Sequence, residues 1–249
     1  MNFWAIIIGV ATFAAAMPSS ADMVMMFSAS DDPGAAPDAT SGVDVWTFSG
    51  TGNVVLFNSS SSNNANIGPA WGINSAGGGA ADTAQIDASL SSLAGFGLGA
   101  GSVVSIDFEN GSVGSAGSVG VQFLSAGSVV SEFSFLSGGS DYLLNGTSTG
   151  IGFTTAGLNL SLAINDNIGG YGFSVSDLSG TQLFNSGGLT FNGGLAPDSI
   201  RVFNNSTGTF SSPDLFVNNL GLKAVAIPEP LTLTTFGLGL AMLCRRRRS

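Results

Sequence analysis

Alternation of apolar and polar side chains is the feature of this sequence that most restricts its fold. Four segments alternate with a period of two, at residues 104–108, 119–123, 158–164 and 171–176. Successive side chains of a β-strand point to opposite faces, so this period gives each strand one face for a core and one for water. The body of the chain is therefore predicted to consist of half-buried strands.

Glycine-containing pairs such as Asn110-Gly111, Asn145-Gly146 and Asn192-Gly193 separate the apolar stretches, and such pairs are typical of tight turns. Further strands are expected at residues 43–48, 53–57, 129–136, 181–184, 189–191, 200–203 and 214–222. Only residues 82–93 suggest a short helix. Many short strands with glycine turns predict an all-β fold, an antiparallel β-sandwich of jelly-roll or lectin-like architecture.

The charges of the body exclude one class of partner. Residues 22–227 contain 15 acidic but only two basic residues, Arg201 and Lys223. Nucleic acids bind proteins largely through Lys and Arg, so an anionic body excludes nucleic-acid binding. The chain has no histidine, and its one cysteine, Cys244, lies near the C-terminus. The body therefore lacks the commonest general base and has no thiol.

The N-terminus resembles a secretory signal peptide. An apolar run occupies residues 3–17, and small residues such as Ser19, Ser20 and Ala21 follow it. This is the length of a signal-peptide apolar region and short for a membrane span. We therefore expect residues 1–21 to be a signal peptide. Residues 22–42, rich in Ala, Ser, Asp and Pro, are predicted to be a flexible lead-in to a β-sandwich at residues 43–223.

Residues 224–249 have three parts. Pro228-Glu229-Pro230 comes first, an apolar segment at residues 231–244 follows, and Arg245, Arg246, Arg247 and Arg248 end it. Proline fixes φ and lacks an N–H, so a helix in the apolar segment cannot extend back through the motif. Its 14 residues would span roughly 21 Å as a helix, short of the ~30 Å apolar core of a bilayer, which thinning and snorkelling arginines can accommodate. Four terminal arginines favour the cytoplasmic side, with the body outside.

This tail resembles the PEP-CTERM sorting signal of bacterial exosortase substrates, a tail that is also labelled an ice-binding-protein C-terminal domain. The resemblance rests on Pro228, Glu229, Pro230, the apolar segment and the arginine cluster, and it covers about the last 22 residues. It implies an exported protein, held transiently in the membrane by its C-terminal helix and processed by an exosortase. The expected location is the cell envelope or the extracellular matrix, in connection with exopolysaccharide and biofilm.

Few residues of the body suggest chemistry. Asp107 and Glu109 lie two apart on one predicted strand and so share a face, which makes them the best pair for a glycosidase. The alternative is two structural carboxylates before a turn. Trp46, Trp71, Tyr142 and Tyr171 are either core residues or platforms for sugar rings. No cofactor is expected, and structural calcium stays open because the body offers oxygen ligands, such as Asp31-Asp32 and Asn165-Asp166-Asn167.

The sequence thus favours a structural or adhesive surface protein that is not an enzyme. The alternative is a lectin-like carbohydrate-binding module that holds exopolysaccharide, and a glycoside hydrolase is a weaker third possibility. The later strands have the general look of legume-lectin and laminarinase-like domains, a resemblance of architecture that does not fix function.

Overall fold

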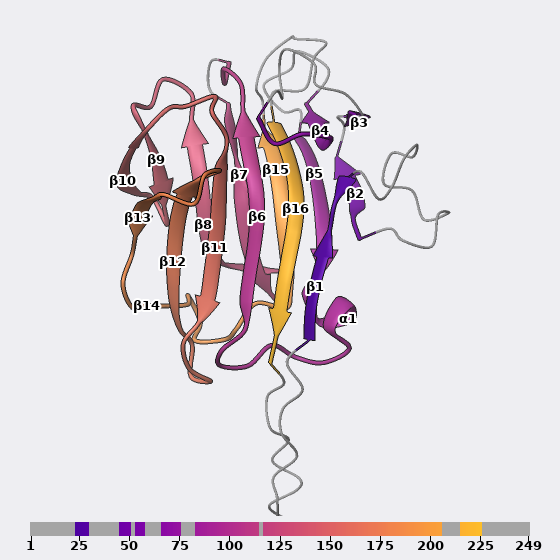
Figure 1. Cartoon of the computed structure of the whole chain (residues 1–249), viewed down its shortest axis with the longest axis vertical. Helices are drawn as coiled ribbons and strands as arrows, with labels where there is room; N and C mark the ends of the chain where they lie inside the picture. Colours follow the sequence, from indigo (N-terminus) through magenta and orange to yellow (C-terminus); the bar gives the residue numbers. More distant parts are fainter. Residues whose placement is uncertain are drawn as a thin grey trace, which may run out of the picture.

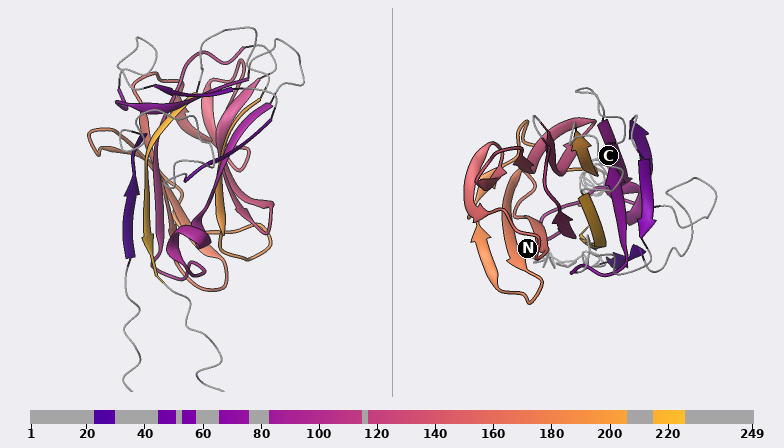
Figure 2. Two further views of the ribbon diagram at one scale, coloured as in Figure 1. Left: turned by 90° about the vertical axis from the view of Figure 1, so that its right-hand side faces the viewer. Right: turned by 90° about the horizontal axis from the view of Figure 1, so that it is seen from above.

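The computed structural model describes residues 23–29, 45–50, 53–57, 66–75, 83–114, 117–205 and 215–225. Within them, two antiparallel sheets face each other, which confirms the predicted β-sandwich (Figures 1 and 2). The four segments with strict alternation all form strands.

Sheet A, within the same residues, has nine strands. Their main order across the sheet is β13 (Gln182–Asn185), β12 (Gly170–Asp177), β11 (Leu158–Ile164), β6 (Val103–Asn110), β16 (Leu215–Ala224), β4 (Ala70–Asn74) and β3 (Asn53–Phe57). Two short strands complete it: β1 (Met23–Phe27) pairs with β16, and β14 (Leu189–Thr190) pairs with β12.

Sheet B has seven strands among the described residues. Their order is β10 (Thr147–Gly152), β9 (Asp141–Leu144), β8 (Ser128–Leu136), β7 (Ser118–Ser125), β15 (Ser199–Asn205), β5 (Thr83–Ser89) and β2 (Thr47–Gly50). One turn of helix, α1 (Leu90–Ala94), follows β5.

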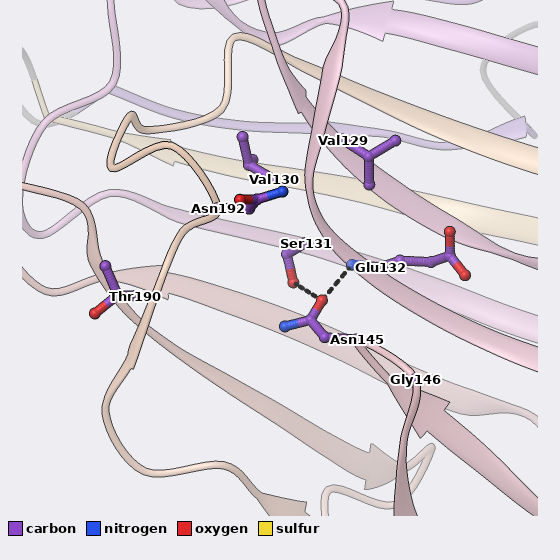
Figure 3. Close-up of a pocket in the computed structure, with 8 residues that line it drawn as sticks. All are labelled: Val129, Val130, Ser131, Glu132, Asn145, Gly146, Thr190 and Asn192. Atoms are coloured by element: carbon purple, nitrogen blue, oxygen red, sulfur yellow. Dashed lines mark hydrogen bonds between the residues drawn. The ribbon is translucent and has the colours of Figure 1, made fainter.

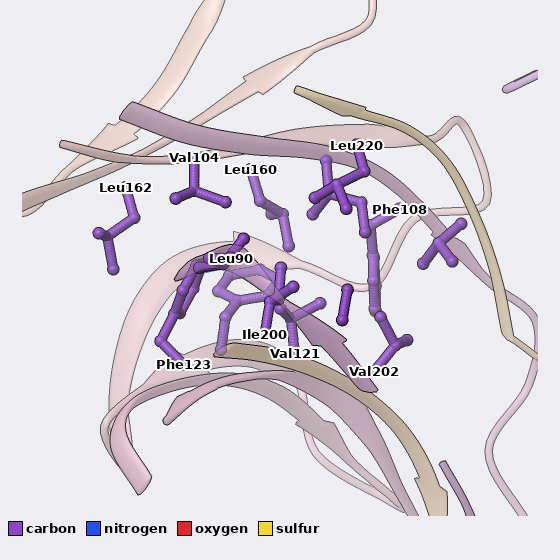
Figure 4. Close-up of a cluster of buried hydrophobic side chains, with 14 of the residues drawn as sticks. Leu90, Val104, Phe108, Val121, Phe123, Leu160, Leu162, Ile200, Val202 and Leu220 are labelled. Atoms are coloured by element: carbon purple, nitrogen blue, oxygen red, sulfur yellow. The ribbon is translucent and has the colours of Figure 1, made fainter. Parts of the chain in front are cut away.

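The core lies between the sheets, where the inward faces of the alternating strands meet. Side chains from both sheets contribute, among them Val104, Phe108 and Leu160 of sheet A and Phe123 and Val202 of sheet B (Figure 4). All five are 0–1% exposed. Apolar burial of this kind contributes roughly 25 cal/mol per Å² and drives the two sheets together.

Two sequence predictions about secondary structure are wrong, one at β1 and one at β5. The predicted lead-in contains β1, which pairs along its whole length with β16 from Met23↔Ala224 to Phe27↔Leu220. The predicted helix at residues 82–93 is mostly strand β5, in which Ala84, Ile86 and Ala88 point into the core. Helix propensity is a weak preference, and pairing of β5 between β15 and β2 overrides it.

A short helix, α1, does form after β5, and each of its ends has a recognisable capping residue. The Ser89 side chain accepts a hydrogen bond from the Ser92 N–H at 3.2 Å, the usual N-cap contact. Gly95 ends the helix with a φ of 74°, a left-handed conformation that glycine adopts without strain. The turn of helix is therefore set by local signals at its two ends.

The pairing of β1 with β16 brings both ends of the domain together. Met23, where β1 begins, is opposite Ala224, where β16 ends. We call this end of the sandwich the terminal end. The turn between β11 and β12 and helix α1 also lie at this end (Figure 1).

Candidate functional site

The two carboxylates singled out in the sequence, Asp107 and Glu109, both lie on β6. Val104, Ile106 and Phe108 of this strand point into the core, so the carboxylates project from the opposite, outer face of sheet A. The prediction that they share a face is confirmed. The surroundings of the two carboxylates differ from each other.

Asp107 is held by neutral amides from the strands on both sides. Its Oδ1 accepts a hydrogen bond from Asn159 Nδ2 of β11 at 2.8 Å, and its Oδ2 accepts one from Asn219 Nδ2 of β16 at 2.7 Å. Asn219 lies where the register of β16 against β6 shifts, and its φ of 49° is left-handed. Asparagine tolerates that conformation better than most residues. In this conformation the Asn219 side-chain amide reaches the Asp107 carboxylate.

Glu109 is buried, with only 3% of its surface exposed. Asn66 covers it: Asn66 Nδ2 donates to Oε1 at 3.0 Å, and the Asn66 backbone N–H donates to Oε2 at 3.3 Å. Burial raises the pKa of Glu109, because desolvation penalises the charged form more than the hydrogen bonds from residues 66 and 67 favour it. The same Asn66 amide also donates to the Thr155 carbonyl at 2.6 Å, which ties this cover to the loop between β10 and β11.

Next to Glu109, the core contains a buried polar contact made by the Tyr142 hydroxyl. The Tyr142 hydroxyl lies 2.6 Å from Asn110 Oδ1 and 3.2 Å from the Thr154 carbonyl oxygen, and both oxygens can accept its proton. Burial, together with the nearby charge of Glu109, raises the pKa of Tyr142 to about 12. The tyrosine is therefore a neutral donor that satisfies a buried asparagine.

The four aromatic residues that the sequence left open are all core residues. Trp46, Trp71, Tyr142 and Tyr171 are 0–3% exposed. The indole rings of Trp46 and Trp71 pack edge to face with centroids 5.8 Å apart. None of the four offers a face on which a sugar ring could stack.

Two of the oxygen ligands proposed for calcium, Asp166 and Asn167, have structural partners. Asp166 Oδ1 accepts hydrogen bonds from the Ile168 and Gly170 N–H groups at 3.0 and 2.7 Å, and Asn167 Oδ1 accepts one from Ala100 N–H at 2.8 Å. The Asp166 contacts form the turn between β11 and β12, and the Asn167 contact joins this turn to the segment before β6. Among the residues that the structure describes, no three His, Cys, Asp or Glu side chains gather as metal ligands. Asp31 and Asp32 lie outside those residues.

A pocket lies between strand β8 of sheet B and the segment around β14. Its volume is about 590 Å³. The lining comes from β8, from the turn between β9 and β10 and from residues around β14, and it consists of Val129, Val130, Ser131, Glu132, Asn145, Gly146, Thr190 and Asn192 (Figure 3). The predicted turn Asn145-Gly146 lies at its edge, but nothing in the sequence indicated that these three segments meet.

Asn145 holds the wall of this pocket together. Its Oδ1 accepts hydrogen bonds from the Glu132 N–H at 2.8 Å and from Ser131 Oγ at 3.3 Å (Figure 3). Its Nδ2 donates to the Tyr171 hydroxyl at 2.7 Å, and that hydroxyl lies 3.1 Å from Ser131 Oγ. The Tyr171 ring stacks on Phe191 with centroids 4.2 Å apart. Side chains from both sheets therefore fix the pocket wall.

The residues of the predicted sorting signals lie outside the described part of the chain. This applies to the signal peptide at residues 1–21, to Pro228, Glu229 and Pro230, and to the apolar segment and the arginines Arg245–Arg248. Within the described residues, no helix has the length and apolarity needed to cross a membrane.

No protein-family model matches this chain, and no curated protein matches it by sequence. Solved structures with a similar fold include a carbohydrate esterase from Shiga toxin-encoding bacteriophage phi24B, with 12% identity over 82% of this chain and 100% of the other and a TM-score of 0.49. Domain 4 of AbnA, an extracellular GH43 arabinanase from Geobacillus stearothermophilus solved with arabinotriose, shares 13% identity over 83% and 94%, with a TM-score of 0.44. The exoplasmic domain of VIP36, solved with Ca²⁺ and Man3GlcNAc, shares 9% identity over 75% and 86%, with a TM-score of 0.42.

Proposed function

We propose that this chain is an exported surface protein whose β-sandwich acts as a structural or adhesive component of the cell envelope or matrix. In this proposal residues 1–21 direct export, and an exosortase recognises Pro228, Glu229 and Pro230 after the apolar tail has entered the membrane. The basic residues Arg245–Arg248 stop the tail at the cytoplasmic side.

The pairing of β1 with β16 supports this proposal. Because Met23 is opposite Ala224, the leader and the tail both join the sandwich at its terminal end. Only six residues, 225–230, separate β16 from the apolar segment, and they reach at most about 20 Å. A domain held in this way directs its opposite end and its side faces outward, which suits a displayed module.

The test compares sorting-motif variants in the producing bacterium. Full-length protein is expected to reach the cell surface in a processed form, whereas Pro228→Ala, Glu229→Ala and Pro230→Ala together should leave a longer, membrane-bound precursor. Ile227→Ala, next to the motif, serves as the matched control. Cell fractionation and digestion of intact cells with protease measure the outcome. Normal processing of the triple variant would contradict the proposal.

A role without catalysis is part of the same proposal. The oxygens of Asp107 and Glu109 are engaged by amides of Asn66, Asn159 and Asn219, an arrangement that serves the fold. A double variant, Asp107→Asn with Glu109→Gln, tests this directly. Polysaccharide cleavage by the wild-type chain that disappears in the double variant would make the protein a glycosidase.

Carbohydrate binding is the second candidate, and one observation favours it. Four of the eight residues that line the pocket beside β8, Ser131, Asn145, Thr190 and Asn192, have hydroxyl or amide side chains, which can bind sugar hydroxyls in the absence of an exposed aromatic platform. Binding of the full-length protein to a glycan array, with and without calcium, tests this function. Saturable binding supports it, and the absence of binding to any glycan rejects it.

A further inference from the structure

We propose that the pocket beside β8 binds one uncharged sugar unit of a polysaccharide, and that Thr190 and Asn192 supply its selective hydrogen bonds. This inference rests on the second candidate function, because it assigns a site and a sugar class to that function. It is carried by the volume of the pocket, by the hydrogen-bonded wall around Asn145, by two unengaged polar side chains and by the charge of its rim.

The pocket has the size and rigidity that a small ligand needs. Its volume of about 590 Å³ falls within the roughly 300–1,000 Å³ usual for small-ligand sites. Asn145, Ser131 and Tyr171 form a closed hydrogen-bond network on one wall, with all contacts between 2.7 and 3.3 Å. Because this wall is already ordered, binding costs less conformational entropy.

Two lining side chains from the segment around β14 have their polar groups unengaged. Thr190 and Asn192 are exposed, and neither side chain has a hydrogen-bond partner among the residues described. Their backbone is nevertheless fixed, since the Asn192 N–H donates to the Val130 carbonyl at 3.2 Å and the Phe191 N–H donates to the Gly169 carbonyl at 2.8 Å. An amide and a hydroxyl held in this way both donate and accept, as neighbouring sugar hydroxyls also do.

The other lining residues determine whether the pocket favours neutral or charged ligands. Val129, which is 36% exposed, gives an apolar contact for the C–H face of a sugar ring, and the lining has no Lys or Arg to hold an anion. The one charged group is Glu132, whose side chain points away from Thr190 and Asn192 (Figure 3). Its Oε2 accepts a hydrogen bond from Gln122 Nε2 at 2.8 Å. A carboxylate at the rim repels acidic sugars and phosphate, so the pocket favours neutral hexoses and N-acetylhexosamines.

The experiment titrates full-length protein in detergent with methyl glycosides of neutral hexoses and N-acetylhexosamines, followed by NMR. A methyl glucuronide and inorganic phosphate form the anionic arm. We expect at least one neutral glycoside to bind saturably and both anions to bind at least about tenfold more weakly. Thr190→Val and Asn192→Leu should each weaken binding about five- to tenfold, the usual value of one hydrogen bond.

Thr47→Val is the matched control, because Thr47 is an exposed threonine on β2, at the other edge of sheet B. Its sugar affinity should equal that of the wild type. Neutral-sugar binding that Thr190→Val and Asn192→Leu leave unchanged, even when combined in one chain, would overturn the site while the carbohydrate-binding function stands. Tighter binding of the glucuronide or phosphate would overturn the sugar class. No saturable binding of any sugar would overturn both the site and the function.

Discussion

Two carboxylates on the outer faces of the two sheets, Asp107 and Asp87, are stabilised in different ways. On sheet A, Asp107 lies between the amides of Asn159 and Asn219. On sheet B, Asp87 pairs with Arg201, through Nε–Oδ1 at 2.7 Å and Nη2–Oδ2 at 3.0 Å. A body with 15 acidic and two basic residues cannot give each carboxylate a cation. Asparagine and glutamine side chains therefore take the place of a cation beside other carboxylates, as Asn66 does for Glu109 and Gln122 does for Glu132.

The largest effect should come from the amide that also occupies a left-handed position. Asn219→Ala removes a hydrogen bond to Asp107 and places alanine, which tolerates the left-handed region less well than asparagine, at a φ of 49°. We expect it to lower the free energy of unfolding by about 3 kcal/mol, measured by urea denaturation. Asn219→Gly separates the two causes, since glycine restores the backbone freedom and loses only the amide. Equal losses in both variants would show that the backbone conformation contributes nothing.

The amide on the other side of Asp107 should matter less. Asn159→Ala leaves the carboxylate with one amide, and Asn159 lies in regular strand β11 without backbone strain. We expect a loss of about 1.5 kcal/mol in the same measurement. Introduced together with Asp107→Asn, it should cost less than the sum of the two single changes, since the two residues interact. Additive losses would contradict a direct interaction.

The buried carboxylate should make stability depend on pH in a defined direction. Glu109 has a pKa above its ordinary value in the folded state, so the folded protein binds its proton more tightly than the unfolded chain does. Its contribution to stability is therefore present at low pH and is lost as pH rises through the raised pKa. Glu109→Gln should remove this part of the decline. Thermal unfolding of both proteins between pH 4 and pH 8 measures the difference, and parallel curves would contradict the burial.

The ion pair of sheet B should have the smallest effect. The Arg201 and Asp87 side chains are 26% and 33% exposed, and such pairs contribute about 0–1 kcal/mol. Arg201→Met should cost no more than that, and the cost should shrink in 1 M salt, where charges are screened. The loss in Asn159→Ala should change less with salt, because a neutral amide is its donor. If salt changed the stability loss in Asn159→Ala more than the loss in Arg201→Met, the proposed difference between the two carboxylates would be contradicted.

Much of the sandwich could be predicted from alternation, because β6, β7, β11 and β12 each place large apolar residues on one face. Strand β5 was missed because its core side chains include Ala84 and Ala88, which give little apolar contrast. Strand β4 was missed because Ala70–Asn74 is buried throughout and shows no alternation. The pocket depends on residues 129–132, 145–146 and 190–192 meeting across the two sheets, a long-range contact that no local pattern encodes.

The mass of the protein recovered from the surface of the producing cell tests the central claim of export and sorting most directly. We expect a chain that has lost residues 1–21 and the arginines Arg245–Arg248, because the leader and the tail are both removed. Recovery of the uncleaved 249-residue chain from the cytoplasm, with none at the surface, would contradict it.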